Sequence, residues 1–328
     1  MSTPFEPVVF RPLPRPLKPF PQETESSFLN RLATANAIPV QRLKQPSRWL
    51  TSRLDPIDRL SVLSGQPRTA IQYAIPHWEN KAWNVSNRPL ALTPRWACRR
   101  CVARRTGTPE PPVMVWRSKY HDQVCTPHRL WIGRAVENPG RQFDLIDLPD
   151  VVQAQQRHYR LLRRHGPAVI TACYEHCSSF WHSLFQRGYR LSDRAERLRQ
   201  MSTRDHHVRP WEPQRYAAVY PEIVEAMSLY ASPHWRRLAQ SAHQFGLFRA
   251  EFNRRLPQEN ALRTTARQWF LIELMRIAHR IERSIEAAEL KALVAHHQAE
   301  AAATEPCTKG CSSIRYIQDH GSRRRPST

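Results

Sequence analysis

Long apolar runs are missing from this sequence. A membrane-spanning helix needs about 20 consecutive, mostly apolar residues, whereas apolar runs in the C-terminal half, such as Trp269-Phe270-Leu271-Ile272, are far too short. The N-terminal segment is rich in proline and lacks the apolar core of a signal peptide. We therefore expect a cytoplasmic protein with no membrane partner.

Sequence motifs of common active sites are also missing. The chain has no P-loop, no G-x-G-x-x-G, no G-x-S-x-G and no acidic cluster typical of a nuclease. His77-Trp78-Glu79 ahead of Cys98-x-x-Cys101 imitates the elements of a zinc nucleoside deaminase. That match lacks a proline directly before Cys98 and leaves a second ligand pair unused. We expect no enzyme, with a deaminase as a remote alternative.

Acidic residues are few relative to basic ones. The 328 residues include 50 Lys plus Arg against 28 Asp plus Glu, which gives a formal net charge of +22. Hydrophobic residues make up 41% of the chain, enough to fill packed cores. A positive field of this size favours a polyanionic partner, either nucleic acid or an anionic membrane surface. The alternative is an excess of arginine spread over solvated helix faces.

The seven cysteines include one pattern with metal-ligand spacing. Cys98-x-x-Cys101 is followed, after 23 residues, by Cys125-x-x-His128. Two residues between ligands let a tight turn point both side chains at one ion, and two such pairs complete a tetrahedral shell. Three thiolates and one imidazole leave no open position, which predicts a structural Zn²⁺ site. Residues 113–116 predict a short strand between the pairs, as in a zinc ribbon.

The other cysteines and a histidine pair are weaker candidates. Cys173 and Cys177 share a helical stripe with large apolar residues and are predicted to be core. Cys307 and Cys311 lie in a polar tail. They are expected either to have no role or to form a second metal site. The pair His206-His207 is predicted to lie in a loop.

Basic residues concentrate around the predicted zinc ligands. Residues 95–134 carry nine Lys or Arg and two Asp or Glu, a net charge of +7 in 40 residues. Basic side chains on a rigid metal module suit phosphate contacts, with a solvated face as the alternative. The candidate DNA contacts in this segment are Arg95, Arg99, Arg100, Arg104, Arg105, Arg117, Lys119 and Arg129.

Composition and periodicity predict a mainly α protein with a small zinc-ribbon-like module. The predicted order is a proline-rich extended arm, an N-terminal helix-turn-helix-like region, the zinc module with short β-strands, a C-terminal helical domain and a disordered basic tail. Their boundaries are residues 1–22, 23–89, 90–138, 139–303 and 304–328. The arm is expected either to dock on a partner or to be a disordered leader.

Residues 56–75 predict a helix, a tight glycine turn and a second helix. Asp55 is a suitable N-cap, Pro56 fits the first helical position, and Gly65 ends the helix. Such a unit can place its second helix in a DNA groove, so Arg68 and Gln72 are further candidate contacts. An ordinary helical hairpin has the same signature.

The C-terminal half predicts long helices. The first runs from Val151 to Gly166, and Pro221 and Ser232-Pro233 are expected to mark later helix starts. A final amphipathic helix follows from apolar residues at steps of three and four: Phe270, Leu274, Ile277, Ile281, Ile285 and Ala288.

Several of these features together resemble the TniQ family, which includes TnsD-like target selectors. They are the proline-rich arm, the helix Glu25-Ser26-Ser27-Phe28-Leu29-Asn30-Arg31-Leu32-Ala33 with Ala35-Asn36-Ala37-Ile38, and the Cys98/Cys101/Cys125/His128 set with Trp116 between the pairs. The likeness covers residues 8–135. Tyr220-Pro221 and Ser232-Pro233-His234-Trp235-Arg236 also look like family features, whereas the glycine of the family's usual opening is absent from Pro21–Ser27.

The resemblance implies an adaptor of DNA transposition that cleaves no DNA itself. Family members link a DNA site or an RNA-guided complex to an AAA+ ATPase regulator that recruits the transposase. On that basis the N-terminal arm and first helices would dock the ATPase, and the zinc module and later helices would contact DNA. The alternatives are a DNA-binding transcriptional regulator that reads its operator with residues 56–75, or a family member that has lost its transposon.

Overall fold

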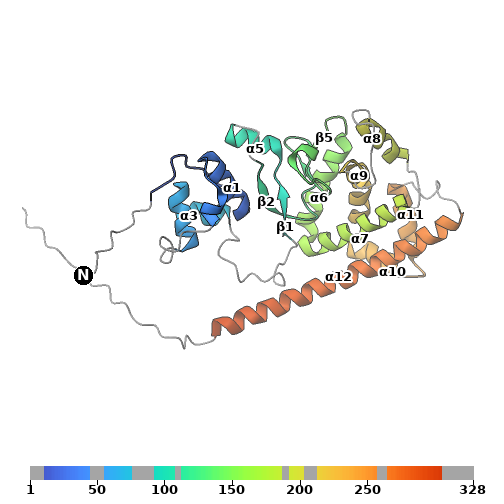
Figure 1. Ribbon diagram of the computed structural model, residues 1–328. Coiled ribbons are helices and arrows are strands. Elements are labelled where there is room, and N and C mark those ends of the chain that lie inside the picture. The colour runs from blue at the N-terminus through green and yellow to red at the C-terminus, as the bar shows by residue number, and fades with distance from the viewer. Residues whose placement is uncertain are drawn as a thin grey trace, which may run out of the picture. The chain divides into compact units, whose positions relative to one another are not determined.

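The computed structural model describes residues 11–44, 55–75, 92–107, 112–186, 192–202, 213–256 and 264–304 (Figure 1). Within these ranges the protein is mainly α, with a few short antiparallel strands, as predicted. Residues 1–289 form one unit and residues 290–328 a second. None of the helices in the described ranges combines the length and the apolar character needed to cross a bilayer.

The N-terminal helices form two hairpins. They are α1 (Glu25–Ala35), α2 (Val40–Lys44), α3 (Pro56–Ser64) and α4 (Arg68–Ala74). Asp55 accepts a hydrogen bond from the Ile57 N–H at the start of α3, and Gly65 ends that helix in the left-handed region with φ of 66°. The predicted helix, glycine turn and helix are therefore confirmed. The buried core of the four helices consists of Phe28, Leu29, Leu32, Ala33, Leu43, Ile57, Leu60, Ile71, Ala74 and Ile75.

The described part of the proline-rich arm, residues 11–22, contains no helix and packs on its own chain. The Leu13 N–H donates to the Leu63 carbonyl over 3.1 Å, and Phe20 is buried with Val102 and Val115. The predicted absence of helix holds there, because proline excludes helix, and the arm ends in a turn at Gln22, whose φ is 61°. Its apolar side chains lie against α1–α4 and the strands of the predicted zinc module. Residues 1–10 lie outside the described ranges.

Glu23 fixes the turn from the arm into α1. Its fully buried carboxylate pairs with Arg31 over 2.6 Å and accepts hydrogen bonds from the Phe20 N–H and the Ser27 hydroxyl. The backbone then pairs with the next segment, since the Thr24 N–H donates to the Met114 carbonyl and the Trp116 N–H donates to the Gln22 carbonyl. The N-terminal helices are thereby joined to the predicted zinc module.

That module and the residues that follow it, up to Asp144, form two small sheets. Strands β1 (Leu92–Trp96) and β2 (Met114–Ser118) pair antiparallel, with Leu92 opposite Ser118, and α5 (Arg99–Thr106) lies between them in sequence. Strands β3 (Val124–Cys125), β4 (Leu130–Trp131) and β5 (Phe143–Asp144) form the second sheet, after a short 3₁₀ helix, η2 (Pro139–Arg141). The strand predicted at residues 113–116 is β2.

The remaining helices contribute to one main core. They are α6 (Pro149–His165), α7 (Pro167–Gln186), α8 (Ser192–Ser202), α9 (Pro213–Tyr230), α10 (Pro233–Gln240), α11 (Phe245–Arg255) and α12 (Thr264–Thr304). Helix α9 packs against α6, α7, α8, α10 and α11. The predicted stripe of α12 is buried from Phe270 to Ile285, whereas Ala288 is only half-buried.

Pro221 does not start a helix, contrary to prediction. It lies inside α9, where its missing N–H removes the hydrogen bond to the Ala217 carbonyl. The helix continues because residues on both sides of the proline, Tyr220 and Ile223, are buried in the main core. Ser232-Pro233 does begin α10, as predicted.

Candidate metal centre

The first ligand pair lies at the beginning of α5. Cys98 is the N-cap residue, and Cys101 follows within the first turn. A buried glutamine holds the backbone on both sides of Cys98: the Gln142 side chain accepts from the Arg99 N–H over 2.9 Å and donates to the Ala97 carbonyl over 2.8 Å. The helix start places both thiols on one side of the turn.

The second pair lies in the hairpin between β3 and β4. Cys125 pairs with Leu130 in the sheet, and the His128 N–H donates to the Cys125 carbonyl over 3.2 Å. Arg129 takes a positive φ of 49°, which turns the chain into β4. This tight turn directs the imidazole back toward Cys125, as the two-residue spacing predicts.

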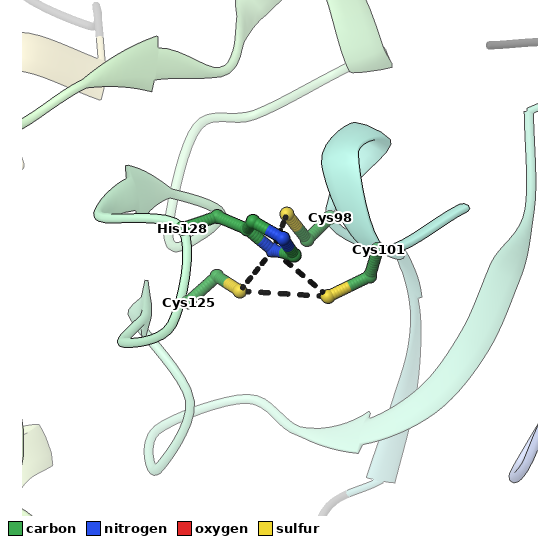
Figure 2. A group of neighbouring side chains, drawn as sticks. All are labelled: Cys98, Cys101, Cys125 and His128. Carbon is green, nitrogen blue, oxygen red and sulfur yellow. Dashed lines mark hydrogen bonds between the residues drawn. The ribbon is translucent and has the colours of Figure 1, made fainter. Parts of the chain in front are cut away.

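The four predicted ligands converge on one point (Figure 2). Their ligand atoms all lie within 4.8 Å of one another. His128 Nδ1 is 3.6 Å from Cys98 Sγ, 3.2 Å from Cys101 Sγ and 3.6 Å from Cys125 Sγ, and the Sγ atoms of Cys101 and Cys125 are 3.7 Å apart. A tetrahedral zinc ion with ordinary bond lengths gives S···N edges of about 3.6 Å and S···S edges of about 3.8 Å. The cluster has the size of a metal shell and can bind a metal ion.

The electrostatics of the thiols also suit a cation. A hydrogen bond with the Cys125 thiol, followed by backbone N–H groups of Cys101 and Arg100, lowers the pKa of Cys98 to about 5. The pKa of Cys125 is raised, chiefly because its thiol is hydrogen-bonded to Cys98, and burial raises the pKa of Cys101. Three thiolates cannot share this space without a positive ion, since each new charge repels the first.

A buried polar network fixes the second hairpin to the helical core. Gln155 of α6 accepts from the N–H groups of Gln123 (2.9 Å) and Val124 (3.0 Å). It also accepts from the Tyr220 hydroxyl over 2.9 Å and donates to the His121 carbonyl over 2.8 Å. His158 Nδ1 lies 2.8 Å from the same hydroxyl. Sequence reasoning missed this network, because no local pattern distinguishes Gln155 from its exposed neighbours Gln153 and Gln156.

Three of the predicted DNA contacts have structural roles. The Arg95 guanidinium donates to the carbonyls of Ser118, Lys119, Asp122 and Ile132 over 3.2–3.3 Å. Arg100 forms a bidentate pair with Asp144 and donates to the His128 carbonyl. Arg68 pairs with both Asp55 and Asp58. These side chains connect segments of the chain, so a phosphate would have to compete for their donors.

The other candidates are more accessible. Arg104, Arg105, Lys119 and Arg129 are exposed, whereas Arg99, Arg117 and Gln72 are half-buried. The Arg105 guanidinium lies 5.5 Å from the centre of the Phe20 ring, in cation–π range. Arg117, together with Trp116 and Thr126, lines a hollow of about 630 Å³ beside Cys101 and Cys125.

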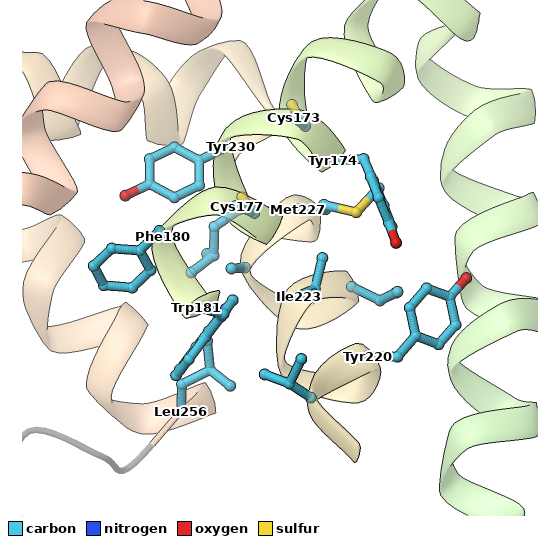
Figure 3. Close-up of a cluster of buried hydrophobic side chains, with 14 of the residues drawn as sticks. Cys173, Tyr174, Cys177, Phe180, Trp181, Tyr220, Ile223, Met227, Tyr230 and Leu256 are labelled. Carbon is cyan, nitrogen blue, oxygen red and sulfur yellow. The ribbon is translucent and has the colours of Figure 1, made fainter. Parts of the chain in front are cut away.

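Cys173 and Cys177 belong to the core, as predicted (Figure 3). Both are fully buried on α7 near Tyr230 and Phe180, and burial raises the pKa of Cys173 to about 12. A neutral thiol is a small apolar side chain, which suits packing rather than metal binding. The deaminase-like His77-Trp78-Glu79, the pair His206-His207 and the two tail cysteines, Cys307 and Cys311, lie outside the described residues.

Comparison of the chain with family models, curated proteins and solved structures gave no match.

Proposed function

We propose that this protein is a zinc-stabilised, DNA-associated adaptor of DNA transposition with no catalytic activity of its own. It would link a target DNA site or an RNA-guided target complex to an AAA+ ATPase regulator and, through it, to a transposase. The observation that carries the proposal is the four-ligand cluster beside exposed arginines. The resemblance of residues 8–135 to the TniQ family supplies the biological context, in the cytoplasm at the nucleoid.

Zinc is the metal that fits the donor set best. Three thiolates and one imidazole in a tetrahedron are typical of structural Zn²⁺ sites, and hard cations such as Mg²⁺ or Ca²⁺ prefer oxygen ligands. All four positions would be filled by protein, so substrate or water would find no open coordination site. The bound ion would hold α5 against the β3–β4 hairpin.

The DNA contact is proposed at the last turn of α5 and the nearby hairpin. Arg104 and Arg105 are exposed there, and Lys119 and Arg129 add positive charge from two other turns. A helix anchored by a metal at its first turn would present these side chains with little loss of backbone entropy. The arm and α1–α4 are left as the surface for the ATPase.

The test combines metal analysis, DNA binding and partner binding. The purified full chain should contain one zinc per protein and bind DNA, and it should retain the neighbouring AAA+ ATPase in a pull-down. Arg104→Ala with Arg105→Ala should lower DNA affinity. It should also reduce the slope of log K against log salt by about 1.8, which corresponds to two lost phosphate contacts. Arg163→Ala with Arg237→Ala is a matched control, because it removes two exposed arginines elsewhere. A metal-free, folded protein that binds neither partner would refute the proposal.

A transcriptional regulator is the second candidate, favoured by the α3–Gly65–α4 geometry. It predicts sequence-specific binding to an operator that depends on Gln72, without an ATPase partner. A Gln72→Ala variant that loses discrimination between operator and random DNA would support it. Transposase and ATPase genes beside this gene would favour the adaptor.

A further inference from the structure

A second basic surface lies among the C-terminal helices. It is a hollow of about 530 Å³ lined by arginines of α6 and α11 and by the beginning of α10. We call it the arginine hollow and define it by Arg157, Arg160, Arg164, Ser232, Trp235 and Arg255. Arg157, Arg160 and Arg164 are spaced three and four apart, so one face of α6 carries all three.

The arginines of this hollow are only partly neutralised. Arg157 and Arg255 both reach Glu225, and Arg255 also pairs with Glu251. Arg160 and Arg164 are exposed, and within the described ranges neither has a carboxylate within 4.0 Å. Burial, then the nearby charges of Arg255 and Arg160, lowers the pKa of Arg157. Positive charges crowded in a concave surface favour an anion.

The remaining lining offers further contacts of the right kind. Ser232 precedes α10, and its side chain makes no capping hydrogen bond. Pro233 has no N–H, and the N–H groups of the first turn donate no hydrogen bond to the Ser232 side chain. Trp235 is half-buried in the lining and presents an aromatic ring next to the arginines. Hydroxyl, backbone N–H and arginine donors are the groups that bind phosphate oxygens, and aromatic rings can stack on sugars or bases.

We propose that the arginine hollow binds the phosphodiester backbone of DNA as a second contact, separate from the metal module. The inference rests on the proposed function for its choice of polyanion. An extended polymer fits better than a free nucleotide, because Arg160 and Arg164 are both exposed to solvent where they line the hollow. Arg164 follows Gln155, which anchors the metal module, by nine residues, or about 14 Å along α6.

The test is DNA binding by the full-length, zinc-loaded protein at several salt concentrations. Arg160→Ala with Arg164→Ala should weaken binding to a fluorescent duplex about tenfold and reduce the slope of log K against log salt by about 1.8, which corresponds to two lost phosphate contacts. The control Arg163→Ala with Arg237→Ala has the same net charge and should change affinity less than about twofold. Unfolding by urea should be unchanged in both variants, since all four residues are exposed.

Other outcomes separate this inference from the proposed function. Equal weakening by the control pair would refute a DNA contact at the arginine hollow, because binding would then depend only on the net positive charge of the protein. A second outcome is that the substitutions at Arg104 and Arg105 weaken DNA binding while those at Arg160 and Arg164 leave it unchanged. That result would refute the DNA contact at the arginine hollow and would be consistent with the proposed adaptor function. Tight binding of the mononucleotide dTMP, lost in the hollow variant while duplex binding persists, would also overturn it. If duplex binding depends on Arg160 and Arg164 but the ATPase is not retained, the DNA contact at the arginine hollow is supported and the proposed adaptor function is refuted.

Discussion

Replacing Gln155 by leucine tests whether the polar network holds the metal module on the helical core. The change keeps roughly the same volume but removes four hydrogen bonds, to Gln123, Val124, His121 and Tyr220. Each buried polar group that loses its partner costs about 1–3 kcal/mol. The Tyr220 hydroxyl still has His158 Nδ1 within 2.8 Å, so three groups lose their partner. Their loss amounts to at least about 3 kcal/mol, offset by about 1–2 kcal/mol from burying a more apolar side chain. We expect the free energy of unfolding to fall by about 1–2 kcal/mol or more.

The measurement is urea unfolding followed by tryptophan fluorescence, since Trp131 is fully buried next to Tyr220. Gln156→Leu is the matched control: it is the same substitution one residue further along α6, at an exposed position. It should change stability by less than about 0.5 kcal/mol. Zinc should also dissociate faster from Gln155→Leu, because the Val124 N–H that holds β3 next to Cys125 loses its acceptor. A Gln155→Leu protein as stable as the control would show that water or rearrangement replaces the network, and the reasoning would fail.

Three further predictions concern the metal, pH and the arginines. Cys125→Ser or His128→Ala should release zinc, measured by metal analysis, whereas Cys173→Ser should retain it; full retention in both ligand variants would exclude the four-ligand site. Burial lowers the pKa of His158 from 6.5 to about 3. The unfolded chain therefore binds the proton more readily than the folded one, and stability should fall as the pH drops from 6.5 toward 3, by up to about 1.4 kcal/mol per pH unit. His158→Gln should flatten this dependence in urea unfolding at pH 6 and pH 4, and an unchanged slope would contradict it. Arg95→Lys should lower stability by about 2 kcal/mol, because a single ammonium cannot replace a fork that reaches four carbonyls. The slope of log K against log salt for its DNA binding should stay unchanged. A slope smaller by about 0.9, which corresponds to one lost phosphate contact, would instead place Arg95 in the DNA interface.

Features that depend on a few neighbouring residues could be predicted from the sequence. Asp55, Pro56 and Gly65 act through local backbone geometry, so the start and end of α3 follow from the residue types alone. The two ligand pairs are predictable for the same reason, because two intervening residues already bring each pair together. Amphipathic spacing likewise identified the buried face of α12 and the core position of Cys173.

Features that depend on distant partners were decided by the tertiary structure. Arg95 and Arg104 are both arginines of the same basic segment, and nothing in the local sequence distinguishes their roles. Arg95 donates to four carbonyls of other segments, whereas Arg104 is exposed. Pro221 has the local signature of a helix start, but burial of its neighbours in the core outweighs the lost hydrogen bond. Gln155 gains its role, and the arginine hollow its concave shape, only when α6 packs beside α9. Spacing along the chain thus determined the metal ligands, both ends of α3, the end of α6 and the start of α10. Packing decided which polar side chains remain available for a partner, because the hydrogen-bond partners of Arg95 and Gln155 come from distant segments of the chain.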